Sequence, residues 1–333
     1  MNQRHDIRLS LPSKGRLATG AASFLEECGL PIHKPNPRQY AATIPNLPQL
    51  TVLFQRPGDI VVSVREGSVD FGISGMDIIA ERRGEDGEIL ILHDALNFGH
   101  CRLAIAVPES WGTVHTMADL AACTKSLDRP LRVATKFTYL TDQFLSDHGI
   151  AFTLIKGEGT LEVAPAIGYA DIISDLVSSG QTLRDNRLRP LEDGVILRSQ
   201  ASLIANRAAL KRRPEVLDVA QQLLEMIEAH LRAEGQLSIF ANIHGPSPEI
   251  IAERMAHKDA LGGLQGPTVA PVVARSGDKD WYDVHIIVRK DRLFRSVQEL
   301  REIGGSGVVV SPVTYIFEEE PTRIREMLDA LDE

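Results

Sequence analysis

Between residues 7 and 206, short runs of β-branched and aliphatic residues alternate with helical segments, and this alternation constrains the fold more than any other feature. Ile7, Leu9 and Leu11 have the period of a strand, and a helical pattern follows and ends near Gly29. Strands are also expected at 50–54, 69–75, 101–108, 131–136, 152–156, 170–177 and 199–206, with intervening helices that include 59–67 and 139–149. The alternation predicts α/β layers around mostly parallel sheets.

The clearest helix covers residues 214–234 and ends at Gly235. One of its faces is apolar, formed by Val216, Val219, Leu223, Ile227 and Leu231. After it the pattern becomes two strands, a helix and a strand. This β–β–α–β order predicts a small separate domain of ferredoxin-like type, with a boundary near residues 235–245.

The bulk composition excludes several classes of function. The 333 residues are enough for two or three domains, and the net charge of −9, without a basic stripe, argues against a nucleic-acid partner. The N-terminus lacks the apolar core of a signal peptide, and no window approaches a membrane span, so we expect a cytoplasmic protein. Three cysteines without a CxxC pair indicate reduced thiols. The HExxH motif is absent, which argues against a zinc site.

The stretch SDLVSSGQTL, residues 174–183, gathers hydroxyl and amide groups around Gly180 directly after the expected strand 170–177. Open α/β sheets bind ligands at the carboxyl ends of their strands. A glycine turn with several N–H and hydroxyl donors suits a phosphate dianion. A serine or threonine cap on a following helix explains the same residues equally well.

Two aspartates lie on this expected strand. Asp171 and Asp175 would share one face, because side chains alternate along a strand. Carboxylates near a phosphate site suit ribose hydroxyls or a bound Mg²⁺.

Cations follow other strands in the same way. Lys14 and Arg16 flank Gly15 after the first strand, and Lys136 ends the strand at 131–136. Such cations can bind anions near a helix N-terminus, although a solvated basic turn is an alternative for the first pair. The GxxxxGK[ST] spacing of a P-loop is absent.

Two further motifs are weaker when taken alone. VDFGISGMDII, residues 69–79, has Gly72 and Gly75 before Asp77, which permits either a ligand or a tightly packed helix to approach. Glu162 could orient a ligand or simply be an acid at a helix N-terminus. Together with the cations these motifs indicate charge stabilisation around a phosphorylated substrate, since no catalytic triad or nucleophile elbow is present.

Several motifs together resemble the ATP phosphoribosyltransferase family. They are LPSKGRL, GDIVVSVREGSVDFGISGMDII, CRLAIAVP, LRVATKF, EVAPAIGYADIISDLVSSGQTLRDNRL and LRSQASLIAN, in this order over residues 7 to 206. The tail, GPTVAPVV…WYDVHIIV…LREIGGSGVVVSPV, resembles the C-terminal regulatory domain of the long form. The resemblance covers nearly the whole chain.

The resemblance implies a two-lobed catalytic part of the type II periplasmic-binding-protein kind and an ACT-like regulatory domain. Lobe I would comprise residues 1–98 and 195–235, lobe II residues 99–194, and the regulatory domain residues 236–333. Adenine N1 of ATP would attack C1 of phosphoribosyl pyrophosphate, with Mg²⁺ as cofactor, in the first step of histidine biosynthesis. The resemblance also implies a homohexamer that histidine inhibits.

The resemblance assigns roles to individual residues. Lys14, Arg16, Glu162 and Asp171 would be catalytic, and Asp175, Ser178, Ser179, Gly180, Gln181 and Thr182 would bind phosphoribosyl pyrophosphate. Arg16, Gly75, Met76 and Asp77 would bind ATP, and Asp171 and Asp175 would lie near the metal. Thr268, Gly305 and Gly307 would form the histidine site.

Two other functions remain compatible with this fold. A non-enzymatic solute-binding protein can use the same two lobes, because fold does not fix function. The missing export signal and the acidic pair argue against it. A regulatory paralogue without activity is disfavoured by the complete 171–182 segment and by Lys14 and Arg16.

Overall fold

The computed structural model describes residues 6–332 except 37–38, 85–86, 158 and 274–279. The chain divides into two compact units, residues 1–227 with 320–333 and residues 228–319. The first unit contains two sheets, and we call each sheet with its helices a lobe. The second unit is called the third domain below.

The first lobe is built on a six-stranded sheet of order β2-β3-β1-β4-β11-β5. Strand β1 pairs in parallel with β3 and β4, and β11 is antiparallel to β4 and β5. Every residue of β4 and β11 is buried, as expected for central strands covered on both faces. Its elements are β1 (Ile7–Pro12), α1 (Arg16–Glu27), β2 (Ala41–Ile44), β3 (Leu47–Gln55), α2 (Pro57–Arg65), β4 (Phe71–Gly75), α3 (Met76–Arg82), β5 (Ile89–His93), β11 (Ala201–Asn206) and α7 (Arg207–Arg212).

The second lobe is built on a five-stranded sheet of order β10-β6-β9-β7-β8. Strands β7, β8 and β9 are parallel, whereas β6 is antiparallel to β9 and β10. Its elements are β6 (Cys101–Pro108), α4 (Met117–Thr124), β7 (Leu131–Thr135), α5 (Thr138–Asp147), β8 (Phe152–Lys156), η1 (Leu161–Val163), β9 (Ile172–Val177), α6 (Gln181–Asp185) and β10 (Leu188–Ser199).

Both sheets share one internal plan. In each, the strand that enters from the other lobe lies between the last two of that lobe's own strands: β11 between β4 and β5, and β6 between β9 and β10. The two crossovers are themselves paired, since Leu96 N–H donates to the carbonyl of Ala201 at 3.0 Å and Ala201 N–H to that of Phe98 at 2.9 Å. This plan confirms the predicted type II periplasmic-binding-protein-like α/β fold.

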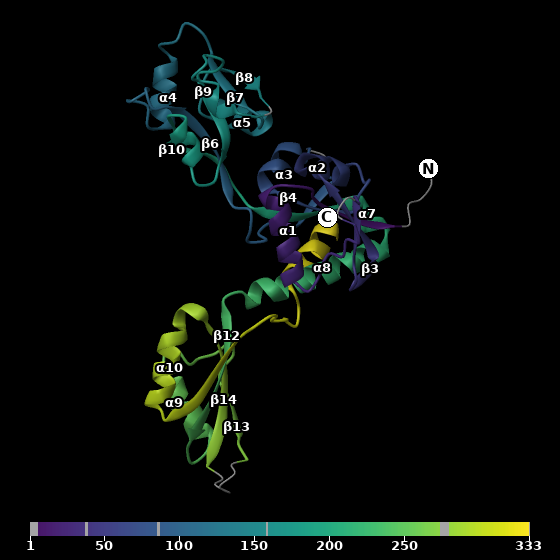
Figure 1. Ribbon diagram of the computed structural model, residues 1–333, viewed down its shortest axis with the longest axis vertical. Coiled ribbons are helices and arrows are strands. Elements are labelled where there is room, and N and C mark those ends of the chain that lie inside the picture. Colours follow the sequence, from purple (N-terminus) through teal and green to yellow (C-terminus); the bar gives the residue numbers. More distant parts are fainter. Residues whose placement is uncertain (1–5, 37–38, 85–86, 158, 274–279, 333) are drawn as a thin grey trace. The chain divides into compact units, whose positions relative to one another are not determined.

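The third domain carries a four-stranded antiparallel sheet of order β13-β14-β12-β15, with α9 and α10 on one face (Figure 1). Ile239, Ala241 and Ile243 of β12 alternate toward these helices and are buried. Its elements are β12 (Gln236–His244), α9 (Pro248–Ala256), β13 (Thr268–Pro271), β14 (Trp281–Arg289), η2 (Lys290–Arg292), α10 (Leu293–Glu302) and β15 (Gly305–Pro312). This β–α–β–β–α–β order is ferredoxin-like, as predicted, although the sequence pattern missed β12 and α9.

The domain ranges differ from the expected ones at two places. Residues 195–199 belong to β10 of the second lobe, because Val195–Ser199 pair with Ala104–Cys101 of β6. The unit boundary falls inside α8 (Pro214–Ala233), and the last helix, α11 (Thr322–Asp332), belongs to the first unit.

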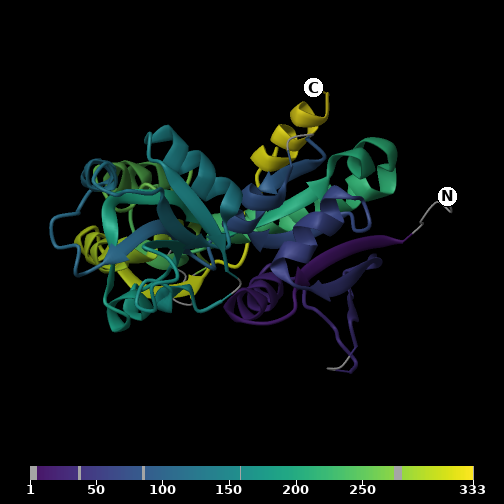
Figure 2. The ribbon, with the colours of Figure 1, turned by 90° about the horizontal axis from the view of Figure 1, so that it is seen from above.

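Helix α11 contacts β5 and α7 of the first lobe, and Figure 2 shows it in yellow at the C-terminus. Arg323 donates to Asp94, which begins the first crossover, and Arg207 donates to the carbonyl of Ala330. The chain therefore returns to the first unit after the third domain. Within the described residues, no helix is long and apolar enough to cross a bilayer.

Candidate functional site

The predicted site residues come mainly from the edge of the two sheets at which the chain crosses from one lobe to the other. In the first lobe β1 and β4 end here and β11 begins, because β11 is antiparallel to β4. In the second lobe β7, β9 and β10 end here and β6 begins. The carboxyl ends of the parallel strands thus bring the 12–17 turn, the 75–77 turn, Lys136 and the 178–182 loop to this edge.

Arg16 and Ser178 join the two lobes directly. Arg16 follows β1 as the first residue of α1, and its Nη2 donates to the Ser178 Oγ at 2.7 Å. Gly15 precedes it at a φ of 80°, a conformation that glycine adopts without steric cost, and Lys14 is exposed beside it. The basic turn of one lobe therefore meets the hydroxyl loop of the other.

The 178–182 loop leaves its hydroxyl groups exposed. The residue that caps α6 is Gly180, at a φ of 74°, so it has no side chain to bond the free amides. The Ser179 Oγ accepts a long hydrogen bond of 3.4 Å from Gln181 N–H, while Ser178 and Thr182 are exposed at the surface. Gly180 therefore occupies the cap position, while the Ser179 hydroxyl still accepts from the first amide of the helix, in part as the capping alternative expects.

Asp77 is the most deeply buried acid among the predicted site residues. Its backbone N–H donates to the Ser199 Oγ at 3.0 Å, and that hydroxyl donates back to Asp77 Oδ1. Burial raises the pKa of Asp77, while the Ser199 hydrogen bond and positively charged Lys136 oppose that rise. Ser199 at the end of β10 thus fixes the rotamer of this carboxyl group.

The two glycines of this motif have different roles. A Cβ on Gly75 would lie 2.4 Å from Asp77 Oδ1, so glycine is needed for the aspartate to fold back on the turn. A Cβ on Gly72 would lie 2.5 Å from Ile60 Cγ2 of α2, which makes Gly72 a helix-packing residue.

The second lobe contributes charged side chains to the site, namely Lys136, Asp175 and Glu162. Burial raises the pKa of Asp175, Lys136 lowers it, and the negative charge of Glu162 raises it further. Since Lys136 acts on both Asp77 and Asp175, its ammonium lies within electrostatic range of both lobes' acids. Lys136 was noted at a strand end but was not among the predicted site residues.

Asp171, which was predicted to be catalytic and to lie near the metal, is at the opposite end of β9 from the 178–182 loop. It precedes the strand, whereas the 178–182 loop follows it, which separates them by about 20 Å of extended chain. Arg129 Nη1 approaches its Oδ2 at 2.6 Å, and Arg132 Nη2 approaches its Oδ1 at 3.0 Å. Hydrogen bonds from Arg129 hold the pKa of Asp171 well below its usual range, with Arg132 adding to the effect.

The two aspartates predicted to lie near the metal are separated by about 13 Å of extended chain, since Asp171 precedes β9 and Asp175 lies near its end. Across the described residues, no group of three or more His, Cys, Asp or Glu side chains could hold a metal ion. Asp175 and Glu162 are the carboxylates that approach each other near the loop.

The three residues expected to form the histidine site do not meet within one chain. Thr268 begins β13, at one edge of the third domain's sheet, whereas Gly305 and Gly307 lie in β15 at the other edge. Two strands separate them, a distance of about 14 Å. Gly305 also has a packing role, because a Cβ there would lie 2.6 Å from the Leu300 carbonyl oxygen.

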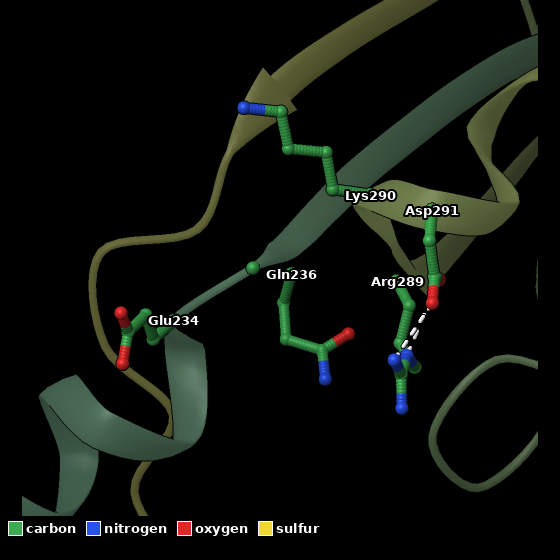
Figure 3. A pocket seen from close by; sticks show the side chains of 6 residues that line it. Glu234, Gln236, Arg289, Lys290 and Asp291 are labelled. Atoms are coloured by element: carbon green, nitrogen blue, oxygen red, sulfur yellow. Dashed lines mark hydrogen bonds and ion pairs between the residues drawn. The ribbon is translucent and has the colours of Figure 1, made fainter. Parts of the chain in front are cut away.

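A cavity of about 570 Å³ lies in the third domain at the start of β12 (Figure 3). Glu234, Gln236, Lys290 and the ion pair of Arg289 with Asp291, at 2.7 Å, line it. Gln236 pairs with Arg289, whereas Gly305 pairs with Ile243 near the far end of β12. This charged cavity is therefore separate from the residues expected to bind histidine.

Sequence analysis missed Ser199, Cys101 and Glu81. Burial raises the pKa of Cys101, and the negative charge of Asp77 adds to this, so the thiol lies beside the same carboxyl group. Ser199 and Cys101 are register partners between β10 and β6. The positions of Ser199 and Cys101 depend on how the two crossovers pair, so no local sequence motif predicts them.

These features define a class. The chain is a two-lobed α/β protein of the periplasmic-binding-protein type with a ferredoxin-like domain attached. The edge at which the chain passes between the lobes carries cations, hydroxyl groups and buried carboxyl groups.

Comparison with known proteins places the chain more closely. The model of the ATP phosphoribosyltransferase family matches residues 56–229, and the model of that family's C-terminal domain matches residues 233–315. The chain belongs to the ATP phosphoribosyltransferase family and is a transferase of histidine biosynthesis.

Individual relatives agree with this. ATP phosphoribosyltransferase 2, chloroplastic, of Arabidopsis thaliana is 47% identical over 98% of this chain and 81% of its own length. ATP phosphoribosyltransferase of Gemmatimonas aurantiaca is 34% identical over 93% of this chain and 99% of its own. A solved ATP phosphoribosyl transferase complex from Thermotoga maritima matches with a TM-score of 0.52 at 23% identity, over 67% of this chain and 98% of that one, which supports the fold alone.

Proposed function

We propose that the chain transfers the phosphoribosyl group of phosphoribosyl pyrophosphate to N1 of ATP, releasing pyrophosphate and forming N1-(5-phosphoribosyl)-ATP. The observation that carries this proposal is the contact between Arg16 and the Ser178 hydroxyl. It joins a cationic turn and a hydroxyl loop from two lobes, as a substrate with a phosphate at each end requires. Membership of the family supplies the reaction.

In this proposal the loop of Ser178, Ser179, Gly180, Gln181 and Thr182 binds the 5-phosphate. Its exposed hydroxyl groups and the turn at Gly180 support that role. Asp175, near the carboxyl end of β9, is suited to the ribose hydroxyls. Arg16 and Lys14 then face the diphosphate that leaves.

The bond-forming step uses the lone pair of adenine N1. The bond from N1 to C1 forms as the bond from C1 to the diphosphate oxygen breaks, and the electron pair leaves with pyrophosphate. Arg16, Lys14 and Lys136 stabilise the charge that develops on this leaving group. Because N1 already carries its lone pair, the step requires no general base, and Asp77 and Glu162 serve to orient the substrates.

Magnesium enters the proposal as part of the substrate. The described residues offer no complete ligand set for the ion, so we propose that it arrives bound to the diphosphate of phosphoribosyl pyrophosphate. Asp175 is the acid best placed to contact its water shell. Removing Mg²⁺ with a chelator should abolish turnover without lowering the melting temperature, because the fold does not depend on the ion.

We further propose that histidine inhibits the enzyme at the third domain and that the active form is a homohexamer. A histidine site that uses both Thr268 and Gly307 needs one residue from each of two copies, because they occupy opposite sheet edges. Loss of inhibition in Thr268→Ala, with unchanged activity without histidine, would support this. Inhibition of a monomeric form by histidine would contradict it.

The direct test is an ultraviolet assay of purified protein with ATP, phosphoribosyl pyrophosphate and Mg²⁺, with the product identified by mass spectrometry. Formation of N1-(5-phosphoribosyl)-ATP by the wild-type protein, and its loss in Arg16→Ala, is expected. Folded protein that binds phosphoribosyl pyrophosphate without turnover would instead support the solute-binding alternative. Asp171→Asn is the matched control, since that carboxyl group lies at the opposite end of β9 from the 178–182 loop.

A further inference from the structure

Helix α5 of the second lobe begins without a capping side chain from its own lobe. It starts at Thr138, directly after Lys136, and its cap residue is Phe137, whose side chain has no acceptor. The first N–H groups of a helix have no partner within the helix, so a buried or half-buried helix start needs an acceptor from elsewhere.

That acceptor comes from the first lobe. Glu81, in the last turn of α3, accepts from Tyr139 N–H at Oε1 and from Leu140 N–H at Oε2, each at 3.0 Å. The Thr138 hydroxyl also lies 3.3 Å from Oε1. A carboxylate at this position satisfies two amides and lies at the positive end of the helix dipole.

The two helices joined in this way both carry cleft groups at their starts. Helix α3 begins with Met76 and Asp77, and α5 follows Lys136. The helices are in contact (Figure 1), and a cavity of about 550 Å³ beside Glu81 and Tyr139 borders the junction. Movement of one lobe against the other would break both Glu81 bonds while leaving each lobe's core intact.

We propose that Glu81 is a positioning residue for phosphoribosyl transfer, which holds the lobes closed by capping α5 from across the cleft. In the closed arrangement Asp77, Lys136 and the 178–182 loop face one site. Substrate binding and the cap then favour the same closed state. Without the cap, part of the binding free energy of the substrate is needed to close the lobes, so the apparent affinity falls. The inference rests on the proposed function for its kinetic readout only.

The test compares Glu81→Ala and Glu81→Gln with Asp119→Ala. Asp119 caps α4 with Thr116 by a reciprocal hydrogen-bond pair, but both residues lie in the second lobe. Glu81→Ala should raise the KM for both substrates by about fivefold to thirtyfold, the effect expected from one lost cap, with kcat changed less than twofold. Glu81→Gln, which keeps one acceptor oxygen, should recover part of the loss.

The control should separate closure from helix stability. Asp119→Ala should lower the melting temperature about as much as Glu81→Ala and leave KM unchanged. A KM for Glu81→Ala within twofold of wild type, or an equal rise in Asp119→Ala, would overturn the proposal.

A second readout does not depend on catalysis. Hydrogen–deuterium exchange at the Tyr139 and Leu140 amides should be faster in Glu81→Ala than in wild type, and phosphoribosyl pyrophosphate with Mg²⁺ should slow it in wild type only. Equal exchange in the two proteins would refute the cap whether or not the wild type turns over. An inactive wild type with the expected exchange would refute the proposed function but support the Glu81 cap.

Discussion

Arg16 of the first lobe donates a hydrogen bond of 2.7 Å to the Ser178 hydroxyl of the second. The bond crosses the edge at which both sheets end, so it exists only when the lobes are together. Both groups can also bind a phosphate oxygen, and a bound substrate would replace the direct contact with two contacts to itself. The pair therefore marks where anionic substrate should enter.

Arg16→Ala should lower kcat/KM for phosphoribosyl pyrophosphate by about a hundredfold, because a charge-assisted hydrogen bond to the leaving group is lost. Arg16→Lys should restore part of the activity, since it keeps the charge but not the planar pair of donors. Steady-state kinetics with each substrate varied in turn measure both effects. A change confined to melting temperature would assign Arg16 to the fold alone.

Thr182→Val should raise the KM for phosphoribosyl pyrophosphate about tenfold, because the exposed hydroxyl at the start of α6 is one of the donors proposed for the 5-phosphate. The KM for ATP should change little, which makes ATP the internal control. An unchanged KM for phosphoribosyl pyrophosphate would remove Thr182 from the phosphate site.

Gly75→Ala should displace the Asp77 carboxyl group, because the new Cβ would lie 2.4 Å from its Oδ1. Separation of Asp77 from Ser199 should lower kcat/KM at least tenfold. Gly112→Ala is the matched control, since no atom lies within 4 Å of the added Cβ there. Equal activity of the two variants would show that the position of Asp77 does not matter for turnover.

Asp171→Asn should lower the free energy of unfolding by about 1–3 kcal/mol at neutral pH and leave KM and kcat unchanged. Arg129 and Arg132 hold the pKa of Asp171 below its usual range, so the unfolded chain binds this proton more readily. The contribution is complete above pH of about 4 and is lost as pH falls below that value. Denaturant unfolding of both proteins across this range should show their stabilities converging in acid.

Arg323→Gln should raise the pKa of His93 and loosen α11 from the first lobe. Burial, together with the positive charge of Arg323, lowers the pKa of His93 to about 4. Neutral His93 accepts from Ala95 N–H, so its contribution is complete above the usual histidine pKa of about 6.5 and is lost as pH falls through 4. Histidine NMR titrations of both proteins measure the shift, and an identical titration would show that α11 has no influence on His93.

Local patterns in the sequence were sufficient for most of the elements. The short β-rich runs at residues 101–108 and 152–156 predicted β6 and β8 with their observed bounds, because such a run depends only on neighbouring residues in the chain. The pattern missed β12, whose partners β14 and β15 come much later in the chain. The lobe ranges expected from the family resemblance placed residues 195–199 in the first lobe, whereas pairing with β6 places them in the second.

Asp171 and Asp175 show the same limit within the site. A strand's period predicts that both lie on one face, but it does not say which end of the strand meets the ligand or which arginines lie nearby. By itself the sequence determined the order of strands and helices, the hydroxyl loop and the cations that follow strands, because these depend on neighbours along the chain. Only the tertiary structure decided that Arg129 and Arg132 form ion pairs with Asp171. It also decided that Ser199 bonds Asp77, and that Arg16 and Glu81 form hydrogen bonds with the other lobe. Those contacts join residues far apart in the sequence, and burial and charge act through space.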